Sequence, residues 1–329
     1  MIRIGILGAA DIAFNRFLPA LRKVQGISCV GLARFSPDED ESRIQRFVER
    51  DGLAVYASFD DLIADPALDA VYVPTPPATH AHWATRVLRS GKHALIEKPI
   101  ATSPQDLDAL LALARETKRA IYENYMFAHH RQIRQVQTWL REGKIGDVRN
   151  MTAYFGFPLR QPNDFRYKKQ LGGGARLDAA GYLTKLADLL LDQPRVVASR
   201  LNGLDGYDVD MYGSFMMVDR RGRNFLASYG MDNAYRCELD IWGSRGSLRT
   251  GRILTAPPAF RPRFDFRYQD REETLELEPD DHFQHSIERF LHILADEEAR
   301  EAEYAYITRG NRNLQALLDQ NVPLTYERT

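Results

Sequence analysis

The sequence predicts an α/β protein in two parts: a doubly wound parallel sheet, followed by an α+β part with a mostly antiparallel open sheet. Apolar strand-like runs alternate with helical patterns up to about residue 123, which is typical of a parallel sheet with helices on both faces. From about residue 148 short strand patterns dominate, and two helical patterns follow them. We therefore predict domains at residues 1–123 and 124–329.

Composition limits the classes of function. The chain has 329 residues, 44% of them hydrophobic and 27% charged, as in a soluble globular protein. A net charge of -1 argues against nucleic acid or an acidic membrane surface as a partner. Cys29 and Cys237 lie in apolar runs, so we expect reduced, buried thiols. No run approaches ~20 apolar residues or resembles a signal peptide, and we expect a cytoplasmic protein.

The first element is a buried parallel strand, which leads through GAADIA (8–13) into a helical pattern. This order is typical of a dinucleotide site, where small residues allow the turn, the approach of the pyrophosphate and the packing of the helix. Only the first of those three positions is glycine, so the motif alone is weak evidence. The backbone expected near the pyrophosphate belongs to Gly8, Ala10, Asp11 and Ile12. We interpret the Asp11 carboxylate as a helix cap directed away from the ligand.

The second strand, residues 27–33, ends where the cofactor is normally chosen. An acidic residue there would bind the ribose of NAD, but the chain has Arg34, Phe35 and Ser36 instead. A guanidinium suits a phosphate, and a serine hydroxyl adds a donor. Arg34 and Ser36 therefore predict NADP(H) as the preferred cofactor. NAD(H), or a surface arginine without a ligand, are the alternatives.

Further strands and helices alternate up to the predicted boundary, and they cover residues 55–56, 59–63, 70–73, 83–90, 94–96, 104–118 and 120–124. Thr75, Pro76 and His80 follow one of these strands, and we expect them near the nicotinamide half of the cofactor. A helix-capping role is the alternative for His80.

Another strand ends in Glu97, Lys98 and Pro99. Ligands of open parallel sheets bind at the carboxyl ends of the strands, so a lysine there lies where a substrate would be. Proline prevents further strand pairing and favours an extended backbone at the lysine. The alternative is a strand end with a solvated charge pair.

The second part contains the candidate strands of an antiparallel sheet, at residues 148–157, 195–202, 210–219, 224–230, 236–242 and 263–268. Helices are expected at about 130–142, 281–296 and 305–320. Such a sheet has one open face, and apolar side chains there would make a homodimer or homotetramer. We do not expect a metal site at His129 and His130, since no third ligand has zinc spacing, and we expect His282 and His285 at the surface.

A glycine-rich stretch, GGGARLDAAGY (172–182), lies between the candidate strands. The three glycines permit a close backbone turn. If the residues after them are helical, Asp178 and Tyr182 share one face, because they are four positions apart. The alternative is a loop before a helix with a packed tyrosine.

Four stretches together resemble one family: VPTPPATH (73–80), GKHALIEKP (91–99), GKIGDVR (143–149) and the glycine-rich stretch 172–182. Their order and spacing are similar to those of the glucose–fructose oxidoreductase / inositol dehydrogenase (Gfo/Idh/MocA) family. The resemblance implies an N-terminal Rossmann domain, a C-terminal antiparallel sheet and a substrate cleft between them. It also implies a catalytic role for Lys98.

Further stretches resemble the nucleotide-sugar 3-ketoreductase branch, namely GAADIA (8–13), ENYMFAHH (123–130), RY (166–167), GMDNAY (230–235) and PP (257–258). Those enzymes reduce the C-3 ketone of dTDP-linked deoxysugars with NADPH. Tyrosine at position 182 is also similar to that branch. Ala180 and Lys185 depart from the wider pattern, which puts the sugar contacts in doubt more than the reaction.

Ketone reduction needs a hydride donor, a group that polarises the carbonyl and a proton source. Lys98 can polarise the carbonyl and stabilise the alkoxide. A phenol has an ordinary pKa of about 10, below that of an alkoxide, so Tyr182 is the expected general acid. Asp178 would orient the pair or bind a sugar hydroxyl, and Glu97 would pair with a cation or the backbone. Glu97 and Lys98 are also expected cofactor contacts. Candidate contacts to the sugar or the diphosphate are Asn124, Arg160, Arg166 and Tyr235.

Two other functions stay open at this point. One is a dehydrogenase of a free sugar, inositol or dihydrodiol that works in the oxidative direction. The other is a regulator that binds NADP(H) without turnover, which the presence of Lys98, Asp178 and Tyr182 disfavours.

Overall fold

A computed structural model describes residues 1–36 and 39–322. It divides into two compact units. Unit 1 contains Met1–Met126 and Phe283–Thr308, and unit 2 contains Phe127–His282 and the chain from Arg309 onward. Phe283–Thr308, late in the sequence, thus packs with the N-terminal unit. From the sequence, in contrast, we predicted a single boundary after residue 123. The Arg115 guanidinium, for example, binds the Glu301 carboxylate at 2.7 Å.

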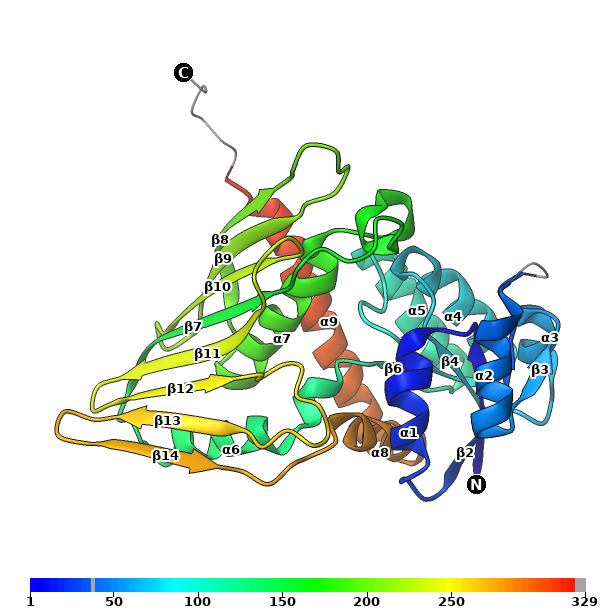
Figure 1. Cartoon of the computed structure of the whole chain (residues 1–329), viewed down its shortest axis with the longest axis horizontal. Coiled ribbons are helices and arrows are strands. Elements are labelled where there is room, and N and C mark those ends of the chain that lie inside the picture. Colours follow the sequence, from blue (N-terminus) through cyan, green and yellow to red (C-terminus); the bar gives the residue numbers. More distant parts are fainter. Residues whose placement is uncertain (37–38, 323–329) are drawn as a thin grey trace. The chain divides into compact units, whose positions relative to one another are not determined.

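Unit 1 is built on a six-stranded parallel sheet in the order β3-β2-β1-β4-β5-β6 (Figure 1). Its strands are β1 Ile2–Leu7, β2 Ile27–Ala33, β3 Ala54–Tyr56, β4 Ala70–Val73, β5 His93–Ile96 and β6 Ile121–Glu123. The chain proceeds outward from β1 in one direction and then, from β4, in the other. The predicted doubly wound sheet is confirmed, and its reversal between β1 and β4 marks the crevice where such sheets bind ligands.

The helices of unit 1 begin at capping residues that the sequence supplies. Ser58 and Ser103 each accept a backbone N–H with the side-chain hydroxyl, and Asp40 does so with its carboxylate. The helical elements are a π-helix Ala13–Phe17, α1 Leu18–Leu21, α2 Glu41–Asp51, α3 Phe59–Ala64, a 3₁₀ turn Pro77–Thr79, α4 His80–Arg89, α5 Pro104–Thr117, α8 His282–Ala295 and the first part of α9 Glu297–Asp319.

Unit 2 is built on an eight-stranded sheet in the order β14-β13-β12-β11-β7-β10-β9-β8. Its strands are β7 Val148–Gly156, β8 Arg195–Asn202, β9 Tyr212–Val218, β10 Asn224–Gly230, β11 Arg236–Gly243, β12 Ser247–Gly251, β13 Arg263–Arg267 and β14 Glu272–Glu276. All neighbours are antiparallel except β7 and β10, which are parallel. The predicted mostly antiparallel sheet is confirmed.

Helices cover one face of this sheet, and no helix of the described residues covers the other face, called the open face below (Figure 1). The covering helices are α6 Arg131–Arg141, α7 Gly181–Leu190 and the later part of α9. Shorter helical elements are the 3₁₀ turns Met126–His129, Phe165–Tyr167 and Lys169–Leu171 and the π-helix Arg176–Ala180. Alternation along β10 shows the two faces: Phe225 and Ala227 are buried, while Leu226 and Ser228 are exposed.

Three elements differ from the sequence-based expectation. Strands β12 and β14 were not predicted; β14 is an edge strand without a fully buried side chain. Helix α9 begins at Glu297 rather than near residue 305, since Asp296 caps it: the Asp296 carboxylate accepts the N–H of Ala299 at 2.9 Å. None of the helices in the described chain is long and apolar enough to cross a membrane.

Candidate active site

The turn after β1 has the geometry of a phosphate-binding loop. Gly8 adopts φ +87°, a left-handed conformation that a side chain would strain. Its N–H donates to the carbonyl of Ala33 at 3.0 Å, which ties the turn to the end of β2. The chain is helical from residue 11. The backbone N–H groups of the first helical turn, which include that of Ile12, therefore point toward an anion bound at this end of the sheet.

Asp11 corrects one sequence-based interpretation. Its carboxylate makes no capping bond; it is exposed and accepts a hydrogen bond from the Arg46 guanidinium of α2 at 2.6 Å. The predicted direction, away from the ligand, is compatible with this ion pair, but the predicted cap is wrong. Asp11 binds Arg46 on α2 instead of a neighbouring backbone N–H, and this contact exists only because α2 packs beside it.

Arg34 lies at the end of β2 beside acidic side chains. Its guanidinium binds the Glu41 carboxylate at 2.7 Å, and only 20% of the Arg34 side chain is exposed. The N–H of Phe35 donates to the Glu39 carboxylate at 2.7 Å, and the carbonyl of Ser36 accepts the N–H of Glu39 at 3.2 Å. A 2′-phosphate held by Arg34 would therefore share the guanidinium with Glu41.

His80 joins the loops that follow β4 and β5. Its ring is fully buried, with Nε2 at 2.7 Å from the Thr75 carbonyl oxygen and Nδ1 at 2.8 Å from that of Pro99. Burial lowers the pKa of His80 to about 4, against the opposing effect of the two carbonyls. The neutral ring donates to one of the carbonyls. The Thr79 hydroxyl donates to the Pro76 carbonyl at 2.8 Å, and the Thr75 hydroxyl lies 2.8 Å from the same hydroxyl.

Glu97 and Lys98 follow the last residue of β5, and both are partly buried. The Glu97 Oε1 atom accepts the Tyr72 hydroxyl and the Asn124 amide, each at 2.7 Å. Burial raises the pKa of Glu97, while the two donors and the positive charge of Lys98 act in the opposite direction. Asn124 was predicted as a substrate contact; it is buried, and its amide oxygen accepts the Ser286 hydroxyl at 2.7 Å.

In unit 2, the glycine-rich stretch does lead into helical structure. Gly172 and Gly174 adopt φ +77° and +113°, and residues 176–190 are helical, first as a π-helix and then as α7. Asp178 and Tyr182 lie four positions apart on this run. The Tyr182 side chain is 7% exposed, and its ring lies 5.1 Å from that of Phe155.

Arg166 bridges two carboxylates. Its Nε donates to Asp178 at 2.8 Å and its Nη1 donates to Asp164 at 3.0 Å. Burial lowers the pKa of Arg166, but the two carboxylates outweigh burial and raise it. The guanidinium charge is therefore compensated by the protein, and Asp178 is held in one orientation.

The other predicted substrate contacts, Arg160 and Tyr235, have their own surroundings. The Arg160 guanidinium lies 5.3 Å from the ring centre of Phe157. The Tyr235 hydroxyl lies 3.0 Å from the hydroxyl of Thr255, and the Arg252 guanidinium lies 5.1 Å from the Tyr235 ring centre. Arg160 and Tyr235 thus carry exposed guanidinium and aromatic groups suited to a phosphate or a ring.

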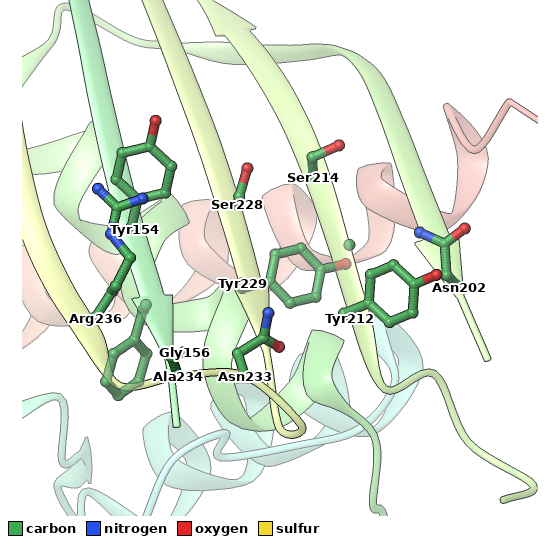
Figure 2. A pocket seen from close by; sticks show the side chains of 12 residues that line it. Tyr154, Gly156, Asn202, Tyr212, Ser214, Ser228, Tyr229, Asn233, Ala234 and Arg236 are labelled. Carbon is green, nitrogen blue, oxygen red and sulfur yellow. The ribbon is translucent and has the colours of Figure 1, made fainter. Parts of the chain in front are cut away.

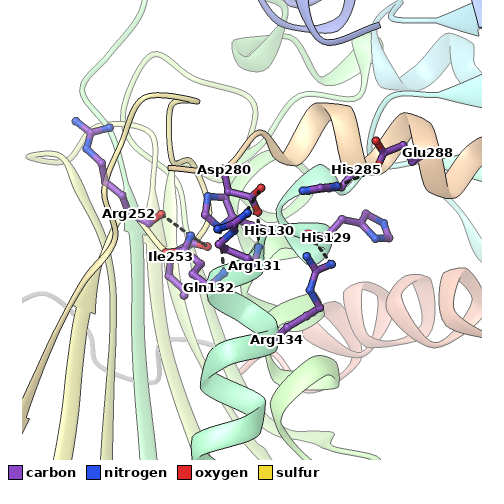
Figure 3. Close-up of polar contacts among 10 residues, drawn as sticks. All are labelled: His129, His130, Arg131, Gln132, Arg134, Arg252, Ile253, Asp280, His285 and Glu288. Atoms are coloured by element: carbon purple, nitrogen blue, oxygen red, sulfur yellow. Dashed lines mark hydrogen bonds and ion pairs between the residues drawn. The ribbon is translucent and has the colours of Figure 1, made fainter. Parts of the chain in front are cut away.

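The histidines have structural surroundings (Figure 3). The His130 Nδ1 caps α6 by accepting the N–H of Gln132 at 3.1 Å, and its ring meets the His282 ring edge-on. His282 was expected at the surface but is buried, because α8 begins against this helix start. His285 pairs with Glu288 at 2.9 Å. Within residues 1–36 and 39–322, no three His, Cys, Asp or Glu side chains are grouped to hold a metal ion.

The sequence did not predict a cavity of about 380 Å³ on the sheet of unit 2. Figure 2 shows Tyr154, Ser214 and Ser228 projecting from neighbouring strands toward the same side. The Arg236 guanidinium lies 3.6 Å from the Tyr154 ring centre and 2.6 Å from the Glu238 carboxylate. Residues on separate strands form this cavity, so no local motif could reveal it.

Sequence reasoning missed four residues that contact the candidate residues within each unit: Tyr72, Ser286 and Glu41 in unit 1, and Asp164 in unit 2. Tyr72 is one apolar-looking residue in a buried strand, and Ser286 lies 162 positions from the asparagine that it binds. Asp164, two residues before Arg166, lies in a polar loop and carries no distinctive spacing. Only the folded chain brings these side chains to the candidate residues that they bind.

The glycine turn, the helix that follows it and the reversal of the parallel sheet define a dinucleotide-binding α/β protein. Comparison with known proteins agrees. The profile of the oxidoreductase family with an NAD-binding Rossmann fold matches residues 2–125, and that of the GFO/IDH/MocA C-terminal domain matches residues 133–249. The chain belongs to the GFO/IDH/MocA family of oxidoreductases, as its motifs predicted.

Individual relatives are more specific. The dTDP-3,4-didehydro-2,6-dideoxy-alpha-D-glucose 3-reductase of Actinomadura kijaniata is 37% identical, over 91% of this chain and 90% of its own. A solved structure of KijD10, a 3-ketoreductase from the same organism in complex with NADP and TDP-benzene, is similar with a TM-score of 0.92 and 34% identity, covering 97% and 98% of the two chains. The D-xylose 1-dehydrogenase (NADP(+)) 2 of Haloferax volcanii is 25% identical over 98% of this chain and 96% of its own.

Proposed function

We propose that this protein reduces the C-3 ketone of a nucleotide-linked deoxyhexose with NADPH. The observation that carries the proposal is the 37% identity, over 302 residues, to a 3-reductase of a dTDP-linked dideoxyglucose. The residues that this reaction needs are present: a lysine at the end of β5 and a tyrosine in the first turn of α7.

The residues of unit 1 fit NADPH. Gly8 brings backbone without a side chain to the pyrophosphate position, and the helix that starts at residue 11 directs its N–H groups there. Arg34 and Ser36 would hold the 2′-phosphate, with Glu41 as a competing partner of the guanidinium. When bound, NADPH supplies the hydride.

Each remaining task has a candidate side chain. Lys98 places a positive charge that polarises the carbonyl and stabilises the developing alkoxide. Tyr182 donates its hydroxyl proton to the oxygen that becomes the new alcohol. Asp178, held by Arg166, orients this acid or accepts a sugar hydroxyl.

Arg160 and Tyr235 are the proposed contacts to the diphosphate or the sugar. Arg166 has a different proposed part: because two carboxylates compensate its charge, we assign it to positioning Asp178 rather than to the diphosphate. Asn124 likewise positions Glu97, since both ends of its amide have protein partners.

We also propose that the open face of the unit 2 sheet forms a homodimer or homotetramer interface. Apolar side chains lie on this face between charged ones: Leu226 is 40% exposed, Tyr212 41% and Trp242 65%. Burial of such side chains against a second copy would remove apolar surface from water.

The reaction can be tested with purified protein, NADPH and dTDP-3,4-didehydro-2,6-dideoxy-α-D-glucose, by following the loss of NADPH absorbance. Consumption of NADPH and formation of a 3-hydroxy product support the proposal. The matched control is the same ketosugar without its nucleotide, which we expect to react at least ~10-fold more slowly because the diphosphate contributes binding energy.

The alternatives give different results in the same assay. Oxidation of D-xylose or a dihydrodiol with NADP⁺, without reduction of the nucleotide ketosugar, would replace the proposal with a free-sugar dehydrogenase. Binding of NADPH without turnover of any of these compounds would instead indicate a regulator.

A further inference from the structure

A chain of hydrogen bonds in unit 1 connects α8 with the Glu97–Lys98 pair. The Tyr122 hydroxyl lies 2.8 Å from the Ser286 hydroxyl. The Ser286 hydroxyl donates to the amide oxygen of Asn124 at 2.7 Å, and the Asn124 amide nitrogen donates to the Glu97 Oε1 at 2.7 Å. The Tyr72 hydroxyl donates to the same carboxylate oxygen at 2.7 Å.

The direction of this chain follows from the orientation of the Asn124 amide. Ser286 has one proton, and the Asn124 oxygen can only accept, so Ser286 donates to it. Tyr122 must therefore donate to Ser286. In the structure the Asn124 oxygen faces Ser286 and its nitrogen faces Glu97. A flipped amide would need a proton on Glu97 to bond its oxygen, so this orientation corresponds to the ionised carboxylate. Every donor in the chain consequently points toward Glu97.

This arrangement matches an ionised Glu97. A carboxylate accepts hydrogen bonds and donates none, and two donors converge on one of its oxygens. Successive hydrogen bonds that point the same way polarise one another, which strengthens the last one in the chain. The titratable groups that face the network from its own and the surrounding elements are Tyr72, Lys98, Tyr122, Glu123, Arg289 and Glu303.

We propose that Ser286 is a positioning residue for the ketone reduction: through Asn124 it holds Glu97 as an oriented carboxylate next to Lys98. A helix from the C-terminal region of the sequence thereby sets the charge at the end of β5. The inference rests on the proposed function only for its kinetic consequence, because the charge of Glu97 can be measured without turnover.

A purely structural serine would act differently. Ser286 is 1% exposed, so its removal costs stability in either case. Only the positioning role also changes the protonation of Glu97. Ser199 is a matched control, since it too is buried and donates its hydroxyl to a single acceptor, the Leu317 carbonyl, in unit 2.

The test is a pH titration of the Glu97 carboxyl ¹³C resonance, assigned by its loss in Glu97→Gln. In Ser286→Ala the midpoint should rise by roughly one pH unit, because the Asn124 donor is no longer held. Tyr122→Phe should give a smaller rise in the same direction, and Ser199→Ala none. Ser286→Thr, which restores a hydroxyl, should return the midpoint toward the wild-type value.

In Ser286→Ala, the acidic limb of the pH profile of kcat/KM should shift to higher pH by the same amount as the Glu97 midpoint. The affinity for NADPH should change less than twofold. An unchanged Glu97 midpoint in folded Ser286→Ala would overturn the inference, as would equal shifts in Ser286→Ala and Ser199→Ala. If Ser286→Ala does not fold, an unchanged midpoint in Tyr122→Phe overturns it. Failure to reduce any ketosugar would refute the proposed function. The titration of Glu97 would still decide whether Ser286 controls the charge of Glu97.

Discussion

Substitution of Tyr182 by phenylalanine separates catalysis from packing. The Tyr182 ring is 7% exposed and lies 5.1 Å from the ring of Phe155 and 5.6 Å from that of Phe127. Phenylalanine keeps these ring contacts and removes only the hydroxyl. The change should therefore leave the fold intact while removing the proposed proton donor.

The expected magnitudes differ clearly. Loss of a general acid lowers turnover by ~100-fold or more, which is about 2.7 kcal/mol at ~1.36 kcal/mol per tenfold. Loss of one hydroxyl from a ring that stays packed changes the free energy of unfolding by about 1 kcal/mol. Tyr182→Ala, in contrast, should cost about 3–5 kcal/mol of stability, because it removes the ring itself.

The assay combines steady-state reduction of the dTDP ketosugar with urea unfolding of each variant. We expect Tyr182→Phe to unfold near the wild-type midpoint and to bind NADPH normally, with kcat reduced at least ~100-fold. A Tyr182→Phe enzyme with wild-type kcat would refute the assignment of Tyr182 as the acid. A large fall in its stability would refute the packing argument.

Lys98→Ala should lower kcat by ~100-fold or more with NADPH binding preserved, and wild-type turnover would exclude carbonyl polarisation by Lys98. Arg34→Ala should raise the KM for NADPH at least ~10-fold and leave the KM for NADH unchanged. Equal changes of both KM values would contradict the assignment of Arg34 to the 2′-phosphate. Burial lowers the pKa of His80 and of His93 from 6.5 to about 4. The unfolded chain thus binds more protons between these values, so stability should fall from pH 6.5 to 4, by about 3 kcal/mol for a fully buried histidine; His80→Gln should flatten this dependence in urea titrations. Trp242→Glu should convert the proposed oligomer to monomers in light scattering, and a monomeric wild type would contradict the interface.

Local patterns were sufficient for much of unit 1. Buried apolar runs and a glycine at the turn after the first strand depend on neighbouring residues, and the structure has both where the sequence predicted them. The caps at Ser58 and Ser103 are equally local, but they were not among the sequence-based predictions. The edge strand β14 escaped prediction because its residues alternate only weakly between partly buried and exposed. Edge strands lack the second neighbour that makes a strand pattern clear.

The candidate site residues also divide into features that short stretches of sequence predict and features that they do not. Lys98 at the end of β5 and the helical spacing of Asp178 and Tyr182 follow from short stretches. The orientation of Asp178 depends on Arg166, twelve positions earlier in the 3₁₀ turn Phe165–Tyr167. Such a contact depends on how this segment folds back onto the π-helix Arg176–Ala180, which no period in the sequence encodes.

The sequence by itself determined the class of fold and the family, and it named the candidate reactive side chains, because these depend on residue type and short-range spacing. The tertiary structure alone decided which partners those side chains have. Arg34 shares its charge with Glu41, and Glu97 receives donors from Tyr72 and, through Asn124, from α8. Hydrogen bonds and ion pairs depend on distances of about 3 Å, and only the folded chain brings such distant residues that close together.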